Sequence, residues 1–285
     1  RGDYFYELII YVVSLLNGNI YIFNTILAAF LVLSVYLFST LLPNTYLSLI
    51  LCFPYIFVVV GMGYTRQGLS LSLLLLFLYF IYKKKVFANI ISITLAILTH
   101  KSSIIYLLIY FFLFKKNKLF NYAVSTIGLL LFYFILSDDL LRLIYYYLGE
   151  GTYLESLGSN FRNSFNILPA IIFFIFYKKY LKVLTFAQIR TCIYLSLLQI
   201  ILFSMSFTFS TFADRMTIYT FPLQLLIYLY LPNLFNKKIK VFILLGILFM
   251  YNLYFFIWLY FGQFSHVWWP YRNIIIEYIF YYPVK

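Results

Sequence analysis

The sequence predicts an all-α, polytopic integral membrane protein, and three observations lead to this fold class. Hydrophobic residues make up 65% of the 285 residues, and charged residues only 10%. The mean hydropathy is +0.95, which means more apolar surface than a soluble domain of this size can bury. Lysines are clustered in short turns between apolar runs. We therefore expect one membrane domain over residues 1–285, with about nine to ten transmembrane or re-entrant helices and its active face on the extracytoplasmic side.

The first segments of the chain predict a loop, a helix at the membrane interface and two spans. Residues 1–7 are charged and predict a loop, and residues 8–16 are too short to span and predict a Tyr-rich helix at the membrane interface. Residues 19–38 and 46–62 predict two spans joined by an uncharged turn. Because the sequence starts in a loop without Met, we expect a transmembrane helix to precede it.

The stretch over residues 67–99 fixes the orientation of the chain. The triplet Lys83, Lys84 and Lys85 separates two apolar runs, and such triplets beside a span mark the cytoplasmic side. One run then places Arg66 outside, and the returning run places His100 outside as well. Residues 86–114 form either two short spans or a re-entrant hairpin, and the sequence leaves both open.

The remaining apolar runs continue the alternation. Residues 120–136 lead out to a polar stretch, residues 137–166, which predicts an extracytoplasmic loop. The later predicted spans are residues 167–177, 186–207, 216–235 and 241–261, with lysine-rich turns after the first and third. Residues 262–285 are then left outside or along the interface.

Charges that were not used for this topology agree with it. Seven acids fall outside: Asp3, Glu7, Asp138, Asp139, Glu150, Glu155 and Asp214. Five arginines fall outside as well, Arg190 being the exception within a span: Arg66, Arg142, Arg162, Arg215 and Arg272. Because topological selection disfavours Arg outside as much as Lys, the arginines indicate guanidinium chemistry on the outer face.

Composition and motifs exclude several other classes. The net charge of +13 comes from clustered lysines that suit anionic lipid head groups, so we expect no nucleic-acid partner. Cys52 and Cys192 lie in apolar runs and predict neither a disulfide nor a metal site. Asp138 and Asp139 have no clear third ligand. Without a phosphate-binding loop or dinucleotide motif, we expect no cofactor.

Several outer polar residues are candidates for function. Arg66 suits a phosphate through two parallel hydrogen bonds, or alternatively it extends to head groups or pairs with an acid. Asp214 and Arg215 are neighbours, and Tyr219 follows Arg215 by one helical turn, which predicts a shared face. The alternative is an Asp–Arg pair that caps a helix.

His100 has three possible roles: general base, hydrogen-bond donor to a leaving phosphate, or polar cap. Lys101 beside it favours attraction of phosphate. Arg142 and Arg162 are candidate substrate contacts in the predicted loop. Arg272 follows Trp268 and Trp269, which predict either an interface belt or a platform for sugar rings.

The residues around Arg66 and His100 carry a resemblance to a known family. An Arg-Gln pair that opens an apolar helix, a basic turn, and a second helix that ends in His-x-Ser resemble the EpsG family of Wzy-like polysaccharide polymerases. FADRMTIY with Arg215 and Tyr219, WWPYRNI with Arg272, and RGDYFYE with Asp3 are similar to further segments of the family. We predict four catalytic residues, Arg66, His100, Asp214 and Arg215, and six substrate-binding residues, Asp3, Lys101, Arg142, Arg162, Tyr219 and Arg272.

The resemblance implies an enzyme of the bacterial cytoplasmic membrane that joins undecaprenyl-diphosphate-linked oligosaccharide repeats of an exopolysaccharide, capsule or O-antigen. Glycosyl transfer would be metal-independent, with the lipid diphosphate as leaving group. Its partners would include the bilayer and a chain-length regulator and flippase of the same pathway. Two alternatives are a flippase for lipid-linked oligosaccharides, which should carry ionisable groups in mid-membrane, and a membrane O-acyltransferase.

Overall fold

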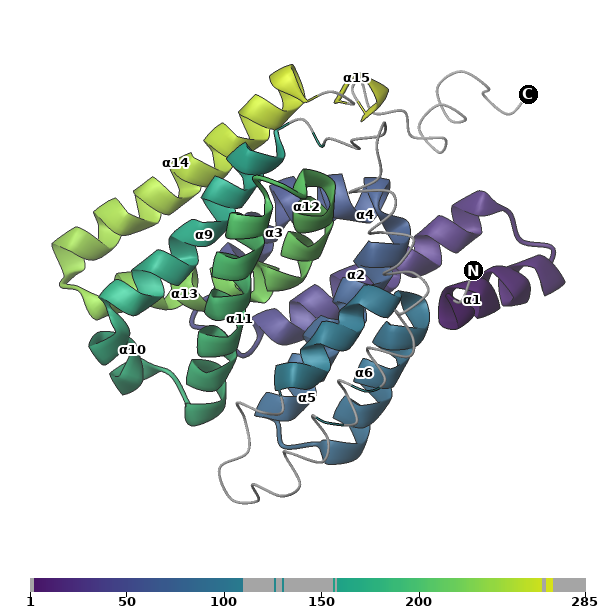
Figure 1. The fold of residues 1–285 in the computed structure, drawn as a ribbon, viewed down its shortest axis with the longest axis horizontal. Coiled ribbons are helices and arrows are strands. Elements are labelled where there is room, and N and C mark those ends of the chain that lie inside the picture. Colours follow the sequence, from purple (N-terminus) through teal and green to yellow (C-terminus); the bar gives the residue numbers. More distant parts are fainter. Residues whose placement is uncertain are drawn as a thin grey trace, which may run out of the picture.

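Helices are the only regular structure in the part of the chain that the computed structural model describes, namely residues 3–109, 126, 130, 156, 158–262 and 265–268 (Figure 1). Within these residues, five helices are long and apolar enough to cross a membrane, or six if one bent pair counts as a span. The predicted class, an all-α polytopic membrane protein, is thereby confirmed.

The elements follow one another without long connections in each of the two main described segments. The first segment contains α1 (Tyr4–Leu15), α2 (Ile20–Ser39), α3 (Thr45–Cys52), the π-helix η1 (Phe53–Val60), α4 (Gly61–Gly63), α5 (Thr65–Tyr82), α6 (Val86–Thr99) and the 3-10 helix η2 (Lys101–Leu108). The second contains α9 (Ser159–Ile175), α10 (Tyr177–Val183), α11 (Phe186–Met205), α12 (Ser210–Thr217), η3 (Ile218–Thr220), α13 (Phe221–Tyr230), η4 (Leu231–Leu234) and α14 (Lys237–Phe261), followed by α15 (Ser265–Trp268).

Polar caps explain where four of the helices begin. The side chains of Asn19, Asn44 and Asn236 accept hydrogen bonds from backbone N–H groups in the first turns of α2, α3 and α14. Thr185 and Gln188 form a reciprocal capping box at the start of α11. Such caps satisfy donors that have no partner inside the helix, which matters more in lipid than in water.

Helix α5 is the centre of the bundle. It packs against α2, α6, η1, η2, η3 and α11, and 61% of its 18 residues are buried. Gly68, Ser70 and Ser72 are buried on this helix, and small residues let neighbouring helices approach closely. The position of Arg66 at the start of α5 is therefore fixed by the most buried of the five long apolar helices.

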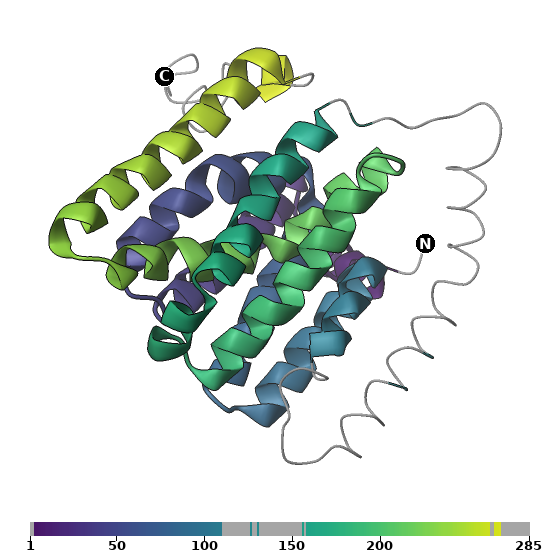
Figure 2. The same ribbon diagram turned by 60° about the vertical axis from the view of Figure 1, so that its left-hand side comes forward.

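The lysine-rich turns lie together at one end of the bundle. In Figure 2 the α5–α6 turn, α10 and the start of α14 lie along the lower left, whereas α12 and the start of α9 lie at the upper right. Arg190 lies in the second turn of α11, 5.1 Å from the centroid of the Phe186 ring. It is thus close to the lysine-rich end of its helix, not at its middle.

The structure differs from the predicted spans in two places. Residues 216–235 are not one helix but a series of short elements, since Pro222 and Pro232 each remove a backbone donor. The last part of the predicted loop 137–166 is helical, because α9 begins at Ser159, and α9 meets α10 at a bend of 82°.

Helix α6 has 14 residues, in agreement with the short run expected there. The predicted span 120–136 falls outside the described residues apart from two positions.

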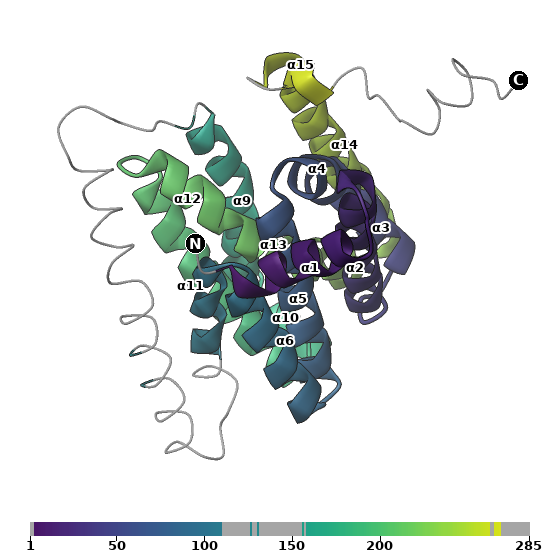
Figure 3. The ribbon, with the colours of Figure 1, turned by 90° about the vertical axis from the view of Figure 1, so that its right-hand side faces the viewer.

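Helix α1 lies across the ends of its neighbours, as Figure 3 shows, and it contacts α2 and α6. The Tyr6 ring packs edge-on against Phe23 at 5.3 Å between centroids. Leu8, Tyr11 and Leu15 remain exposed, as expected of a helix at an interface. This arrangement brings Asp3, just before α1, to the start of α5.

Cysteine labelling tests the orientation. Gly63→Cys and Thr208→Cys should react with a membrane-impermeant maleimide added outside intact cells, because both positions are exposed at the predicted outer end. Lys84→Cys and Lys238→Cys, exposed at the lysine-rich end, should react only after permeabilisation. The native Cys52 and Cys192 are buried and would be replaced by Ala as background. Labelling of both lysine positions from outside would reverse the topology.

Candidate active site

The first wall of the site is built around Arg66, the second residue of α5. Its Nη1 donates to Asp3 Oδ2 at 2.8 Å, and its guanidinium carbon lies 5.2 Å from the centroid of the Tyr6 ring. The Tyr6 hydroxyl in turn lies 2.9 Å from Thr65 Oγ1. The expected alternative, a pairing with an acid, is therefore observed. The Arg66 side chain is still 42% exposed, and only one of its five N–H donors is used by Asp3.

His100 joins α6 to η2 and caps the second of these helices. Its Nδ1 accepts a hydrogen bond from the backbone N–H of Ser102 at 3.3 Å, and its carbonyl accepts one from Ser103 Oγ at 2.8 Å. A neutral imidazole that accepts through Nδ1 carries its proton on Nε2. The side chain is thus set up to donate from Nε2.

Charged groups from three elements surround His100. Burial lowers the pKa of His100 below its ordinary value of 6.5, the Asp3 carboxylate raises it, and the Arg215 and Arg66 guanidinium groups lower it further. The imidazole is therefore neutral at pH 7. Asp3, Arg66, Arg215 and His100 are thus close enough to interact electrostatically, although they come from distant parts of the sequence.

Arg215 and Tyr219 do not share a face as predicted. Arg215 is exposed, and in the described part of the chain it makes no ion pair or hydrogen bond. Tyr219 lies in the 3-10 turn η3 and is fully buried. Its ring meets the His100 ring edge-on at 6.4 Å between centroids, and its carbonyl accepts a hydrogen bond from the Tyr106 hydroxyl. Tyr219 therefore supports His100 from behind.

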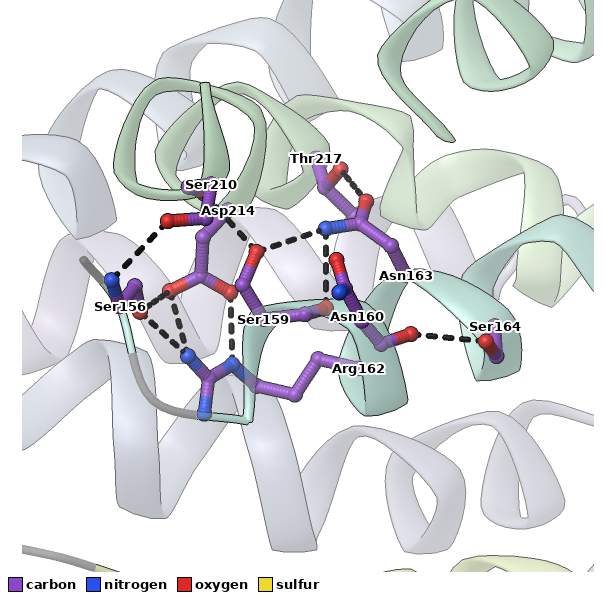
Figure 4. Close-up of polar contacts among 9 residues, drawn as sticks. All are labelled: Ser156, Ser159, Asn160, Arg162, Asn163, Ser164, Ser210, Asp214 and Thr217. Carbon is purple, nitrogen blue, oxygen red and sulfur yellow. Dashed lines mark hydrogen bonds and ion pairs between the residues drawn. The ribbon is translucent and has the colours of Figure 1, made fainter. Parts of the chain in front are cut away.

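Asp214 pairs with Arg162, not with the adjacent Arg215 (Figure 4). Arg162 Nε donates to Asp214 Oδ1 at 2.6 Å, and Nη2 donates to Oδ2 at 2.8 Å. Ser156 Oγ also donates to Oδ2, at 3.1 Å. Both side chains are mostly buried, with 23% and 13% exposed. This bidentate pair ties the first turn of α9 to α12, and it rules out the expected alternative of an Asp214–Arg215 cap.

A line of polar contacts continues from this pair into the bundle. Ser159 Oγ donates to the carbonyl of Ser210 at 2.8 Å, and Thr217 Oγ1 donates to Asn163 Oδ1 at 2.6 Å. One turn deeper, Gln224 Nε2 donates to Asn166 Oδ1. The sequence analysis missed this line, although polar residues recur on α9 every three or four positions, the period of a helix face.

A pocket lies beside the ion pair. It encloses about 330 Å³, open solvent included, and its lining residues come from η1, α4–α5, α9, α12–η3 and α14: Tyr55, Val59, Tyr64, Arg162, Asp214, Arg215, Ile218 and Trp258. Arg215 belongs both to this pocket and to the group of charges around His100. The group of charges around His100 and the pocket are therefore adjacent parts of one candidate site.

The remaining predicted site residues are placed as follows. Lys101 is the first residue of η2, adjacent to His100. Arg142 and Arg272 lie outside the described residues. Over the part of the chain that the structure describes, no group of three or more His, Cys, Asp or Glu side chains is arranged to hold a metal ion.

Comparisons with known proteins gave one match. The family model described as EpsG family matches residues 1–273 of the chain. Searches of curated proteins and of solved structures gave no match.

The electrostatics of His100 can be tested by titration. In ¹⁵N-histidine NMR of the purified protein, His100 should titrate below pH 6.5. Asp3→Asn removes a charge that raises the pKa of His100 and should move the midpoint to lower pH. Arg215→Gln removes a charge that lowers it and should move the midpoint to higher pH. Because the pKa of His100 is lowered in the fold, its neutral form contributes stability above pH 6.5 that is lost as the pH falls. His266 is the internal control. Shifts of the His100 midpoint in the opposite directions would show that these charges do not act on His100 as described.

Proposed function

Because the chain belongs to the EpsG family, the family of Wzy-like exopolysaccharide polymerases, we propose that it joins lipid-linked oligosaccharide repeats into a longer polymer. The repeats would be carried on undecaprenyl diphosphate, and the reaction would take place at the outer face of the bacterial cytoplasmic membrane. The product would be an exopolysaccharide, a capsule or an O-antigen. A flippase would supply the repeats, and a chain-length regulator would act with the polymerase.

The observation that carries the proposal is the set of charges around His100. Arg66 and Arg215 both act on its imidazole, and both guanidinium groups are accessible, with Arg66 42% exposed and Arg215 exposed. Guanidinium groups bind phosphate oxygens through two parallel hydrogen bonds. A diphosphate carries enough negative charge for two of them. The site therefore suits the leaving group of a lipid-linked sugar.

The chemistry requires no nucleotide and no metal ion in this scheme, since the donor brings its own leaving group. A hydroxyl oxygen of the acceptor sugar attacks the anomeric carbon of the donor and forms the new C–O bond. The bond from that carbon to the diphosphate breaks, and its electron pair leaves with the lipid diphosphate. Arg66 and Arg215 stabilise the charge that develops on the diphosphate, which is the kind of interaction that lowers a barrier most.

Two further side chains have roles in this scheme. His100 donates from Nε2 to the departing diphosphate, because the bond from Ser102 to Nδ1 occupies its other nitrogen. Asp214 accepts the proton of the attacking hydroxyl. Its Oδ1 accepts one hydrogen bond, from Arg162 Nε, and a carboxylate oxygen has a second lone pair available. In this scheme Asp214 is therefore the general base, and His100 is the hydrogen-bond donor.

The alternatives find less support. A flippase should carry ionisable side chains in mid-membrane, but Arg190 lies near the start of α11 beside Phe186. An O-acyltransferase would need a route for a cytoplasmic acyl donor. The described turns at the lysine-rich end, around residues 83–85, 178–182 and 237–240, offer no acid or His for acyl transfer.

Lysine substitutions test the arginines. Arg66→Lys and Arg215→Lys keep the charge but lose the bidentate geometry. Each should slow polymerisation by about 100- to 1,000-fold, the usual effect of removing one preorganised donor. The measurement is the chain-length distribution on a gel, together with binding of a lipid diphosphate to each purified variant.

Arg190→Lys is the matched control, because Arg190 lies at the opposite end of the bundle, and it should leave the polymer unchanged. If both Arg66→Lys and Arg215→Lys make polymer of normal length, the two arginines have only structural roles. Accumulation of single lipid-linked repeats on the outer leaflet in Arg66→Ala cells would separate a polymerase from a flippase, whose loss traps repeats inside.

A pair of substitutions at His100 separates donor from base. His100→Gln retains an N–H donor that cannot accept a proton from a hydroxyl at neutral pH, whereas His100→Ala retains neither function. If His100 donates, His100→Gln should keep most of the rate and His100→Ala should lose about 100-fold. Both rates come from single-turnover assays at saturating substrate. Equal loss in the two variants would make His100 the base.

A further inference from the structure

The π-helix η1 positions Tyr55 between two cavities. Runs of π-helix are rare and often occur at functional sites, and here the run is eight residues long, with Pro54 near its start. Tyr55 lines the pocket beside Arg162 and Asp214 and also a second, smaller pocket. The side chain is only 8% exposed, so it faces these cavities and not the lipid.

Tyrosine hydroxyls without protein partners gather at these cavities. The hydroxyls of Tyr55 and Tyr254 lie within electrostatic reach of Arg162, Asp214 and Tyr64. In the part of the chain that the structure describes, none of the three tyrosine hydroxyls makes a hydrogen bond, although neighbouring polar groups do. The oxygens of these hydroxyls are not enclosed by protein atoms, and Tyr64 is 41% exposed, so all three hydroxyls are open to a ligand. A ligand with several hydroxyl groups would supply the missing partners.

Aromatic rings line both cavities, Trp258 the one beside the ion pair and Tyr254 the second one. The Trp258 ring is stacked on Phe255 with an angle of 8° between planes, and the Tyr254 ring is stacked on Phe161 with an angle of 6°. Tyr55 packs edge-on against Tyr254 at 5.9 Å between centroids. These contacts hold the aromatic faces in place before any ligand arrives. Such faces suit the apolar C–H side of a sugar ring, whose hydroxyl groups point outward.

The charge of the pocket indicates a neutral ligand. Arg162 and Asp214 neutralise each other through their bidentate contact. Among the described residues that line the pocket, Arg215 is the charged side chain outside this pair, and it also belongs to the group of charges around His100. From the open hydroxyls, the fixed aromatic rings and this charge balance, we infer that the pocket at Tyr55, Tyr64 and Trp258 binds a sugar ring of the substrate, next to the diphosphate. The inference rests on the proposed function and assigns a binding site for the carbohydrate part.

Binding assays with separate parts of the substrate test this inference. The probes are methyl glycosides of the first and last sugars of the repeat, and farnesyl diphosphate, which has no sugar. Tyr55→Phe and Tyr64→Phe remove one hydroxyl each from the pocket and keep the ring. Each should weaken binding of one of the two glycosides by about tenfold, as expected for one hydrogen bond, and leave binding of farnesyl diphosphate unchanged. Tyr228→Phe is the matched control, since its buried hydroxyl only approaches Met250 Sδ at 4.0 Å.

The outcomes separate the inference from the proposed function. Dependence on Tyr55 for the first sugar identifies the donor ring, and for the last sugar the acceptor ring. Wild-type affinity for both glycosides in Tyr55→Phe and Tyr64→Phe would overturn the sugar pocket, even in a protein that makes polymer. Binding of a glycoside that depends on Tyr55, in a protein that makes no polymer from lipid-linked repeats, would keep the pocket and overturn the polymerase. Because folded Trp258→Leu should also lose affinity for the glycoside, the result does not rest on the tyrosines alone.

Discussion

The ion pair between Arg162 and Asp214 is the contact on which the end of the bundle opposite the lysine-rich turns depends. In an apolar bundle, a charged side chain must find its partner within the protein. Arg162 and Asp214 do so across more than fifty residues of sequence, and they thereby fix α9 against α12. The line of polar contacts behind them holds the same two segments together deeper in the bundle. As a result, Arg215 projects from a fixed short helix, although prolines interrupt the chain after it.

The site is divided by charge. Arg66 and Arg215 face the region around His100, whereas Arg162 is satisfied by Asp214 and leaves the adjoining pocket close to neutral. This division matches the proposed substrate, which has a strongly anionic part joined to a neutral one. Asp3 has a double effect, because it partly neutralises Arg66 and also opposes the lowering of the pKa of His100. The electrostatics of the site thus depend on residues from both of the main described segments.

The sequence was sufficient for the class and for most helices, and it correctly placed Arg66, His100 and Arg215 at the end of the bundle opposite the lysine-rich turns. Apolar runs and lysine turns report directly on the membrane, so α2, α5, α11 and α14 were predicted to within a few residues. It was not sufficient to predict which polar side chains pair with each other. Arg162 was assigned to a loop, because a polar stretch does not show that its last part is helical, and the pairing of Asp214 depends on tertiary packing. The pocket was missed because Tyr55 and Trp258 look like ordinary lipid-facing aromatics in the sequence.

The π-helix that carries Tyr55 has a consequence for how this part of the chain can change. A π-turn contains more residues than an α-turn. The eight-residue run of η1 therefore has more residues between α3 and α4 than an α-helix with the same number of turns would have. Substitutions preserve that length, but a deletion would let the segment wind as an α-helix and turn one flank against the other by about 100° per residue. The Tyr55 side chain would then no longer point into the pocket, although every apolar residue would still be present. This membrane segment is therefore constrained in its number of residues more than in their identity, and a hydropathy profile does not detect such a constraint.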